Sequence, residues 1–347
     1  MNIAVLPFDM ASPGDSSGMR RALRSLAIRE VLQLAVLAKV EGPATLNDVS
    51  RQLAAACFAA ELRRAGGARL ERRSLMLLSV GCEGVITPGG WIVACLRGRA
   101  GGETGLVAGH ARSRPIPVRE RATILHMRAA ASAVRAAMRS AALERRGVEL
   151  VLIKSPIRLL GGSAAASTAA SRGIAALGSA VALGELRASS IGEASLCADG
   201  SLHSSKTMAF SGTETDCCEA LVFGHRRGGD PRLRLDRAVL TDLMDTAPLD
   251  ALAAGAAPSL VLYKAGIAGD GTLRGARTTV FSSEWPSDKQ LRAAASGVVA
   301  AAFGTTRAFI SGGAEHQARP GECLIAVIRL LHAPISEAFT WQGRGGG

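Results

Sequence analysis

Lysine and serine residues recur along this chain at positions where they could form catalytic pairs. Arginine provides most of the positive charge, and of the five lysines three lie at the end of an apolar run: Lys39, Lys154 and Lys264. A serine that leads into glycine and glutamate comes later in each third of the chain: Ser79, Ser211 and Ser311. A serine hydroxyl becomes a nucleophile when a base takes its proton, and a buried lysine with a lowered pKa can be that base. The pattern therefore indicates Ser–Lys chemistry in three copies.

Glycine and glutamate accompany each serine. Backbone N–H groups beside these glycines could bind a substrate oxygen and form an oxyanion hole. The glycines concerned are Gly81, Gly212 and Gly312. In the other interpretation, each lysine forms an ion pair with the glutamate of its repeat and each serine merely ends a strand. Three copies in the same order favour a functional site.

An arginine opens a predicted helix in each third of the chain. These residues are Arg51, Arg172 and Arg292. A single arginine at a helix start is usually a surface residue, but three beside three Lys/Ser pairs predict a ring of donors around a pseudo-threefold axis. Such a ring would hold a small flat molecule by its outward carbonyl groups.

The elements that position these residues form a repeated unit. Each third reads as a buried strand ending near lysine, an Ala-rich amphipathic helix, and a second strand running into serine and glutamate, with a period of about 110 residues. Segments rich in small and turn-forming residues separate the thirds. The sequence therefore predicts an α/β fold of three similar domains, at residues 1–105, 106–250 and 251–347.

Composition excludes several classes of protein. The chain is 48% hydrophobic, so it is not disordered, and it contains no apolar run long enough to span a bilayer. The net charge is +12, but the arginines are dispersed and only 3% of residues are aromatic, which favours ordinary solvated surfaces over nucleic-acid binding. Seven scattered cysteines and an N-terminus without a secretory pattern predict reduced thiols in the cytoplasm.

Several segments together resemble the ring-opening amidohydrolase family, which includes cyanuric acid hydrolase and barbiturase. They are SPGDSSG (12–18), KVEGPATLNDVSR (39–51), SVGCEGV (79–85), SRGIAALG (171–178), RGARTT (274–279) and SGGAEHQ (311–317). The resemblance implies three α/β domains with pseudo-threefold symmetry around a central β-barrel, and one active site on the axis. It also implies a homo-oligomer, plausibly a tetramer, and serine attack on a cyclic amide carbonyl.

The resemblance also implies a role for each residue. The dyads are Lys39/Ser79, Lys154/Ser211 and Lys264/Ser311, with the central dyad supplying the nucleophile and the arginines holding substrate carbonyls. One departure concerns this nucleophile: Ser79 and Ser311 lie four residues before their glutamates, whereas Phe210 has that position in the central repeat. Ser211 is one residue late, which on a strand turns its side chain to the opposite face.

A second departure concerns a metal. The family has a carboxylate two residues after the third lysine that helps to hold a divalent cation, and this chain has Gly266 there. We therefore expect no metal, and the chemistry requires no organic cofactor.

The sequence predicts hydrolysis of a C–N bond in a small cyclic amide, imide or ureide, with Lys154 as base and Ser211 or another repeat's serine as nucleophile. The expected partner is this planar substrate, or its linear precursor, and neither nucleic acid nor a membrane. Two alternatives remain open. A diverged member could close a lactam or imide ring in a biosynthetic pathway, or the fold could bind a planar ligand without catalysis.

Overall fold

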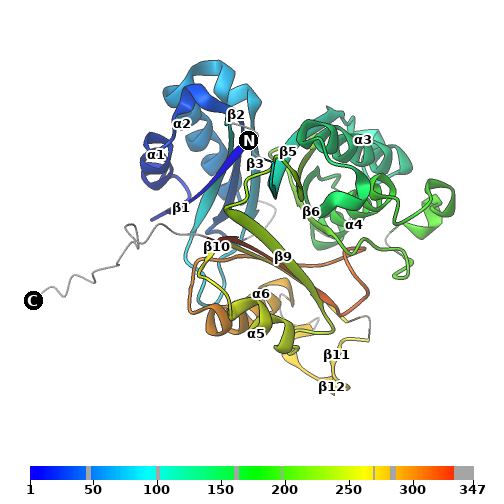
Figure 1. The fold of residues 1–347 in the computed structure, drawn as a ribbon. Helices are drawn as coiled ribbons and strands as arrows, with labels where there is room; N and C mark the ends of the chain where they lie inside the picture. The colour runs from blue at the N-terminus through cyan, green and yellow to red at the C-terminus, as the bar shows by residue number, and fades with distance from the viewer. Residues whose placement is uncertain are drawn as a thin grey trace, which may run out of the picture.

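Three four-stranded sheets form the framework of the molecule in the computed structural model (Figure 1). The structure describes residues 1–43, 48–98, 102–159, 164–196, 198–268, 270–281 and 287–331. In each sheet the strands lie in the order first, fourth, second, third of that repeat, and the second and third strands are parallel while the other pairs are antiparallel. The predicted internal repeat is therefore present in the strand pairing.

The first repeat contains β1 (Asn2–Asp9), α1 (Ser17–Arg24), β2 (Val31–Val40), α2 (Ser50–Arg73), β3 (Ser74–Val80) and β4 (Gly89–Leu96). The second contains β5 (Thr104–Pro115), α3 (Ile124–Ala141), β6 (Val148–Pro156), α4 (Ala164–Leu183), β7 (Thr207–Gly212) and β8 (Cys217–Arg227). The third contains β9 (Leu233–Leu240), α5 (Ala247–Ala253), β10 (Pro258–Ala265), α6 (Ser287–Phe303), β13 (Phe309–Gly312) and β14 (Cys323–Leu330). A small hairpin, β11 (Thr272–Leu273) and β12 (Ala276–Arg277), is added to the third repeat.

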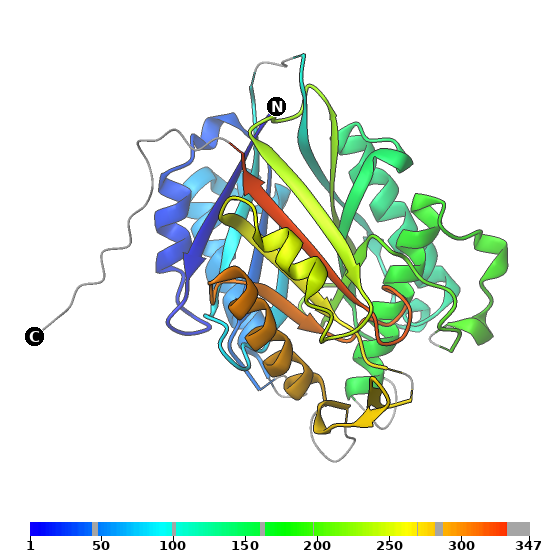
Figure 2. The same cartoon turned by 60° about the horizontal axis from the view of Figure 1, so that its bottom comes forward.

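The helices of each repeat cover the outer face of its sheet, and the inner faces turn toward one another (Figures 1 and 2). One central hydrophobic core contains residues of all three sheets, among them Leu37, Leu152 and Leu262. Separate cores lie between each sheet and its helices. Because both faces of each sheet are buried, the strands are almost continuously apolar, which is the pattern that made them recognisable in the sequence.

The three sheets keep separate ladders in the part of the chain that the structure describes, so the expected closed central barrel is not one continuous hydrogen-bonded sheet.

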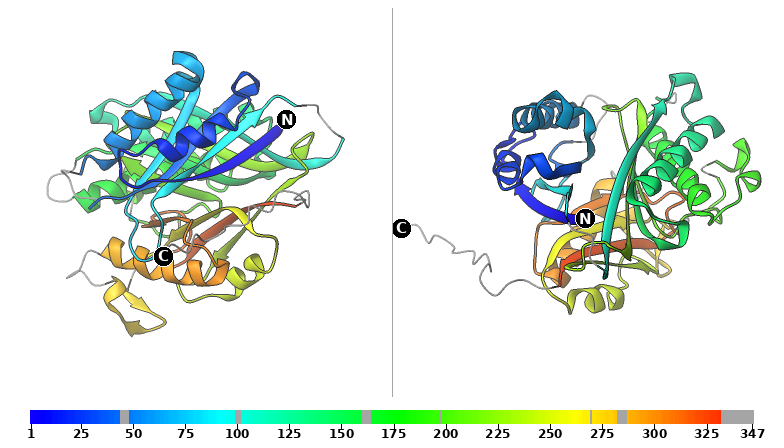
Figure 3. Two further views of the ribbon diagram at one scale, coloured as in Figure 1. Left: turned by 90° about the vertical axis from the view of Figure 1, so that its left-hand side faces the viewer. Right: turned by 45° about the horizontal axis from the view of Figure 1, so that its top comes forward.

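The second sheet begins at Thr104 and the third at Leu233, whereas the sequence predicts domain divisions after residues 105 and 250. β9 lies beside β14 at the edge of the third sheet (Figure 2). The separation into three lobes is also visible in Figure 3.

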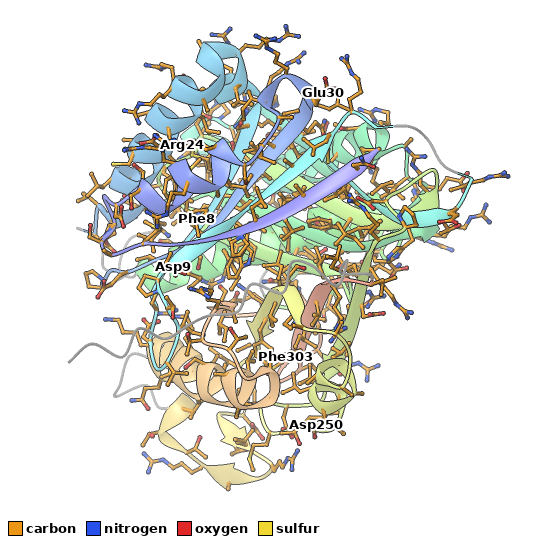
Figure 4. The ribbon with its side chains drawn as sticks, turned by 60° about the vertical axis from the view of Figure 1, so that its left-hand side comes forward. Phe8, Asp9, Arg24, Glu30, Asp250 and Phe303 are labelled. Carbon is orange, nitrogen blue, oxygen red and sulfur yellow. The ribbon has the colours of Figure 1, made fainter. Side chains whose placement is uncertain are left out.

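Contacts between side chains join the repeats at the surface as well as in the core. Asp9, at the end of β1 and labelled in Figure 4, accepts two hydrogen bonds from Arg307 of the third repeat. The six cysteines in the described residues are free thiols. None of the described helices is both long and apolar enough to cross a membrane.

Candidate active site

The parallel strands of each sheet place one lysine beside one residue of the neighbouring strand. In the first sheet Lys39 lies opposite Ser79, and in the third sheet Lys264 lies opposite Ser311. In the second sheet Lys154 lies opposite Phe210. This is the register that the spacing to the glutamates predicted, and it holds through Ser155 and Ser211 without a bulge.

The two outer repeats form the predicted Lys/Ser contacts. Lys39 Nζ donates to Ser79 Oγ at 3.1 Å, and Lys264 Nζ donates to Ser311 Oγ at 3.2 Å. Both lysines are buried, while Ser79 and Ser311 keep 9% and 7% of their surface exposed. Lys264 Nζ also donates to the carbonyl oxygens of Ala209 and Gly312, at 2.8 and 3.2 Å.

The central repeat does not form the predicted Lys154–Ser211 pair. Lys154 Nζ donates to the carbonyl oxygens of Leu78 and Ser211, at 2.6 and 2.9 Å, and forms an ion pair with Glu214 Oε1 at 2.6 Å. The Ser211 hydroxyl donates to the Thr168 carbonyl oxygen at 3.2 Å, on the side of the sheet that α4 covers. The reason is strand alternation, because a shift of one residue reverses the face that a side chain occupies. In this repeat the alternative interpretation of a Lys–Glu pair is the observed one.

Burial lowers the pKa of two of these lysines. The pKa of Lys39 falls to about 7, first through desolvation and then through the positive charge of Arg292. Desolvation lowers the pKa of Lys154 to about 8, and the nearby carboxylate of Glu214 opposes this fall. Lys39 is therefore the stronger candidate for a neutral amine at physiological pH.

The three predicted arginines each bind a glutamate of another repeat. Arg292, of the third repeat, donates to both carboxylate oxygens of Glu83, of the first, at 2.7 and 2.6 Å. The other two contacts run from each repeat to the next. Arg172 donates to Glu315 at 2.8 and 2.7 Å, and Arg51 Nε lies 3.4 Å from Glu214 Oε2. Together the three pairs form a closed cycle that joins first to second, second to third and third to first repeat.

The glycines beside the serines make room for these ion pairs. A Cβ at Gly81 would lie 2.6 Å from Glu83 Oε2, and one at Gly212 would lie 2.0 Å from Glu214 Oε2. In the third repeat this place belongs to Gly313, the residue after the predicted oxyanion-hole glycine Gly312, since a Cβ at Gly313 would lie 2.1 Å from Arg172 Nη2. The backbone N–H of Gly81, a predicted oxyanion donor, donates to the Val40 carbonyl oxygen at 2.8 Å in this structure.

Two aromatic rings connect the outer Lys/Ser pairs. Phe210 and Phe309 pack edge to face, with ring centroids 5.1 Å apart. Lys264 Nζ lies 5.1 Å from the centroid of Phe210, and Lys39 Nζ lies 5.8 Å from that of Phe309. Sequence reasoning missed Phe309, although its place two residues before Ser311 assigns it to the same face of the strand.

The position of the family's metal-binding carboxylate is tightly enclosed here. A Cβ at Gly266 would lie only 2.0 Å from the carbonyl oxygen of Glu322, so a longer side chain does not fit this backbone. Among the described residues there is also no group of three or more His, Cys, Asp or Glu that could hold a metal ion. These residues do not fit the family's cation.

The site and fold together define a threefold-repeated α/β protein with buried Lys/Ser pairs and inter-repeat Arg–Glu pairs. The model of the amidohydrolase ring-opening protein family matches residues 4–329. The chain therefore belongs to this family and is an enzyme of the ring-opening amidohydrolase class.

Individual relatives agree along nearly the whole chain. A cyanuric acid amidohydrolase of Methylobacterium sp. strain 4-46 is 32% identical over 93% of this chain and 96% of its own length. A cyclic amide hydrolase of Azorhizobium caulinodans is 30% identical over 94% and 99%. The crystal structure of a cyanuric acid hydrolase from A. caulinodans superposes with a TM-score of 0.87, at 31% identity, and covers 96% of this chain and 99% of that one.

Proposed function

We propose that this enzyme hydrolyses a C–N bond in a small cyclic amide, imide or ureide, with Ser79 as nucleophile and Lys39 as base. The observation that carries the proposal is the hydrogen bond of 3.1 Å between Lys39 Nζ and Ser79 Oγ at a buried position. The names of the relatives, cyanuric acid amidohydrolase and cyclic amide hydrolase, support this class of substrate.

The surroundings of the three lysines favour Lys39 as the base. A buried ammonium is stable when acceptors surround it, and Lys154 has two carbonyl oxygens and a carboxylate. Lys264 has two carbonyl oxygens besides the serine. Lys39 Nζ makes one hydrogen bond within the described residues, and that bond is to Ser79. Its neutral amine is therefore the least disfavoured of the three, and Lys264 would serve Ser311 as a fixed donor.

The reaction follows from this geometry. The neutral Lys39 amine takes the proton of Ser79 as Oγ attacks a ring carbonyl carbon, and the Lys39 ammonium returns a proton to the ring nitrogen as the C–N bond breaks. Water then attacks the Ser79 ester; Lys39 takes the proton of this water and passes it to Ser79 Oγ as the ester C–O bond breaks, and the ring-opened acid leaves. Arg292 uses Nε and Nη2 to bind Glu83, so Nη1 is the nitrogen that it could direct to the developing oxyanion.

We propose that the inner faces of the three sheets are arranged as a barrel around the site. The hydrophobic core that all three sheets share is the evidence for this arrangement, although their hydrogen-bonded ladders are separate. We propose further that the enzyme is a homo-oligomer and that it acts in the cytoplasm, which the free thiols of the described residues support.

Turnover of a panel of rings by the purified enzyme tests the function. The panel contains cyanuric acid, barbituric acid, dihydrouracil, hydantoin and succinimide, and each opening is followed by mass spectrometry. Ser79→Ala should lower kcat at least ~1000-fold. Ser211→Ala is the matched control, because its hydroxyl contacts the Thr168 carbonyl on the other face, and it should retain activity within about 3-fold. Loss in Ser211→Ala with activity kept in Ser79→Ala would overturn the assignment of the nucleophile.

Ring closure remains a second candidate because Phe210 brings an apolar ring to the position of the central serine. An apolar surface disfavours water, which ring closure must exclude. If no ring opens and an activated linear amide is cyclised in a Ser79-dependent manner, the enzyme works in the closing direction. Tight binding without turnover in either direction would instead indicate a binding protein.

A further inference from the structure

The central repeat presents an aromatic side chain where the outer repeats present serines. Phe210 is opposite Lys154 in the same register that places Ser79 opposite Lys39 and Ser311 opposite Lys264. Its ring belongs to the central core shared by the three sheets, so it points inward. The pseudo-threefold site therefore has two polar sectors and one apolar sector.

The contacts of Phe210 fix this apolar sector. The ring is 3% exposed and packs edge to face on Phe309, while Lys264 Nζ lies over it at 5.1 Å. Lys154 cannot replace the lost hydroxyl, because its ammonium is held by Glu214 and two carbonyl oxygens. A carbonyl group directed at this sector would meet the aromatic ring and lose its hydrogen bonds to water.

We propose that the substrate is a six-membered cyclic imide or ureide with two carbonyl groups rather than three. Its three alternating ring carbons would carry a carbonyl toward Ser79, a carbonyl toward Ser311, and a CH2 toward Phe210. Glutarimide and dihydrouracil have this pattern, whereas cyanuric acid and barbituric acid carry carbonyl groups on all three carbons. This inference rests on the proposed function, since it concerns the substrate of the same site.

Kinetics with matched rings test the preference. The wild-type enzyme should open dihydrouracil or glutarimide with a kcat/KM at least about 10-fold above that for cyanuric acid. The reason is that the third carbonyl group of cyanuric acid would face Phe210 without a hydrogen-bond donor. Phe210→Ser should reverse this ratio, by about 10- to 100-fold. Phe210→Leu keeps the sector apolar and should keep the wild-type preference, as should Phe223→Leu, which removes another ring of the same core. A thermal melt of each variant checks that it is folded.

A binding measurement separates this inference from the hydrolysis itself. Titration calorimetry of Ser79→Ala with dihydrouracil and with barbituric acid reports ring preference without turnover. If no ring is opened by the wild type, the proposed hydrolysis fails, while tighter binding of dihydrouracil would still support the apolar sector. Tighter binding of barbituric acid, equal binding, or no binding of either ring would overturn the inference. So would a wild-type kcat/KM that favours cyanuric acid, or a preference that Phe210→Ser leaves unchanged.

Discussion

Arg292 holds Glu83 through two hydrogen bonds, and the same guanidinium lowers the pKa of Lys39. The three residues come from two repeats: Arg292 from the third, and Glu83 and Lys39 from the first. The proton affinity of the proposed base thus depends on a residue that is more than two hundred positions away in sequence.

The first prediction concerns pH. If Lys39 must be neutral to act, kcat/KM should rise through pH 7, where its pKa lies. Arg292→Gln removes a positive charge and leaves Glu83 unbalanced, and both changes favour the Lys39 ammonium, so the rising limb should move upward by about one pH unit. Arg172→Gln is the control, because Arg172 binds Glu315 in another repeat. Equal shifts in the two variants would contradict the role of Arg292.

The second prediction concerns the stability that the protein loses by burying Lys39. Unfolded Lys39 is protonated below its ordinary pKa of 10.5, whereas the folded side chain releases its proton near pH 7. The unfolded state therefore binds more protons between these values, and wild-type stability should increase as the pH rises from 7 to 10.5. Lys39→Met removes this penalty and should raise the free energy of unfolding at pH 7 by ~2–4 kcal/mol, with a smaller gain at pH 9.5.

Lys154→Met is the matched comparison for that measurement. It leaves the buried Glu214 carboxylate with Arg51 at 3.4 Å as its remaining ion-pair partner among the described residues. The free energy of unfolding should fall by about 3 kcal/mol, the opposite sign to Lys39→Met. Urea titrations of both variants at pH 7 and 9.5 check the pair, and destabilisation in Lys39→Met would argue against a buried, uncharged lysine at this position.

The third prediction concerns the Arg–Glu cycle. Arg172→Met should cost about 2 kcal/mol of unfolding free energy, because it removes the buried guanidinium that pairs with the half-buried Glu315 carboxylate. The double variant with Glu315→Met should cost less than the sum of the single changes, with a coupling of about 2 kcal/mol. The exposed pair of Arg63 and Glu71 is the control, and Arg63→Met should cost less than about 1 kcal/mol. Strict additivity at Arg172 and Glu315 would show that the pair does not couple the repeats.

The fourth prediction concerns glycine. Gly313 has φ +75°, and an added Cβ would lie 2.1 Å from Arg172 Nη2, so Gly313→Ala should lower the free energy of unfolding by about 2–3 kcal/mol. Gly297, inside α6, would place a Cβ in open space, and Gly297→Ala should instead stabilise by about 0.5–1 kcal/mol. Thermal or urea unfolding distinguishes the two directions, and equal effects would remove the steric explanation.

The sequence predicted what depends on local periodicity. Apolar runs and helix patterns located the repeat, and counting back from Glu214 placed Phe210 opposite Lys154, as the register confirms. The partner of each arginine depends on how whole repeats sit against one another, and no local pattern specifies that. Gly313 was missed for a related reason: its role is set by the approach of Arg172 from another repeat.

The cycle of ion pairs has a consequence for how the enzyme gains its reactivity. A first repeat detached from the third would lose Arg292, and water would reach Lys39, so that the amine would return to its charged and unreactive form. Chemical competence is then a property of the closed circle of three repeats and not of the repeat that contributes the nucleophile. A partly unfolded chain would carry every proposed catalytic atom, but its Lys39 would have an ordinary pKa and stay charged. Such a chain would therefore be inactive until the three repeats have assembled.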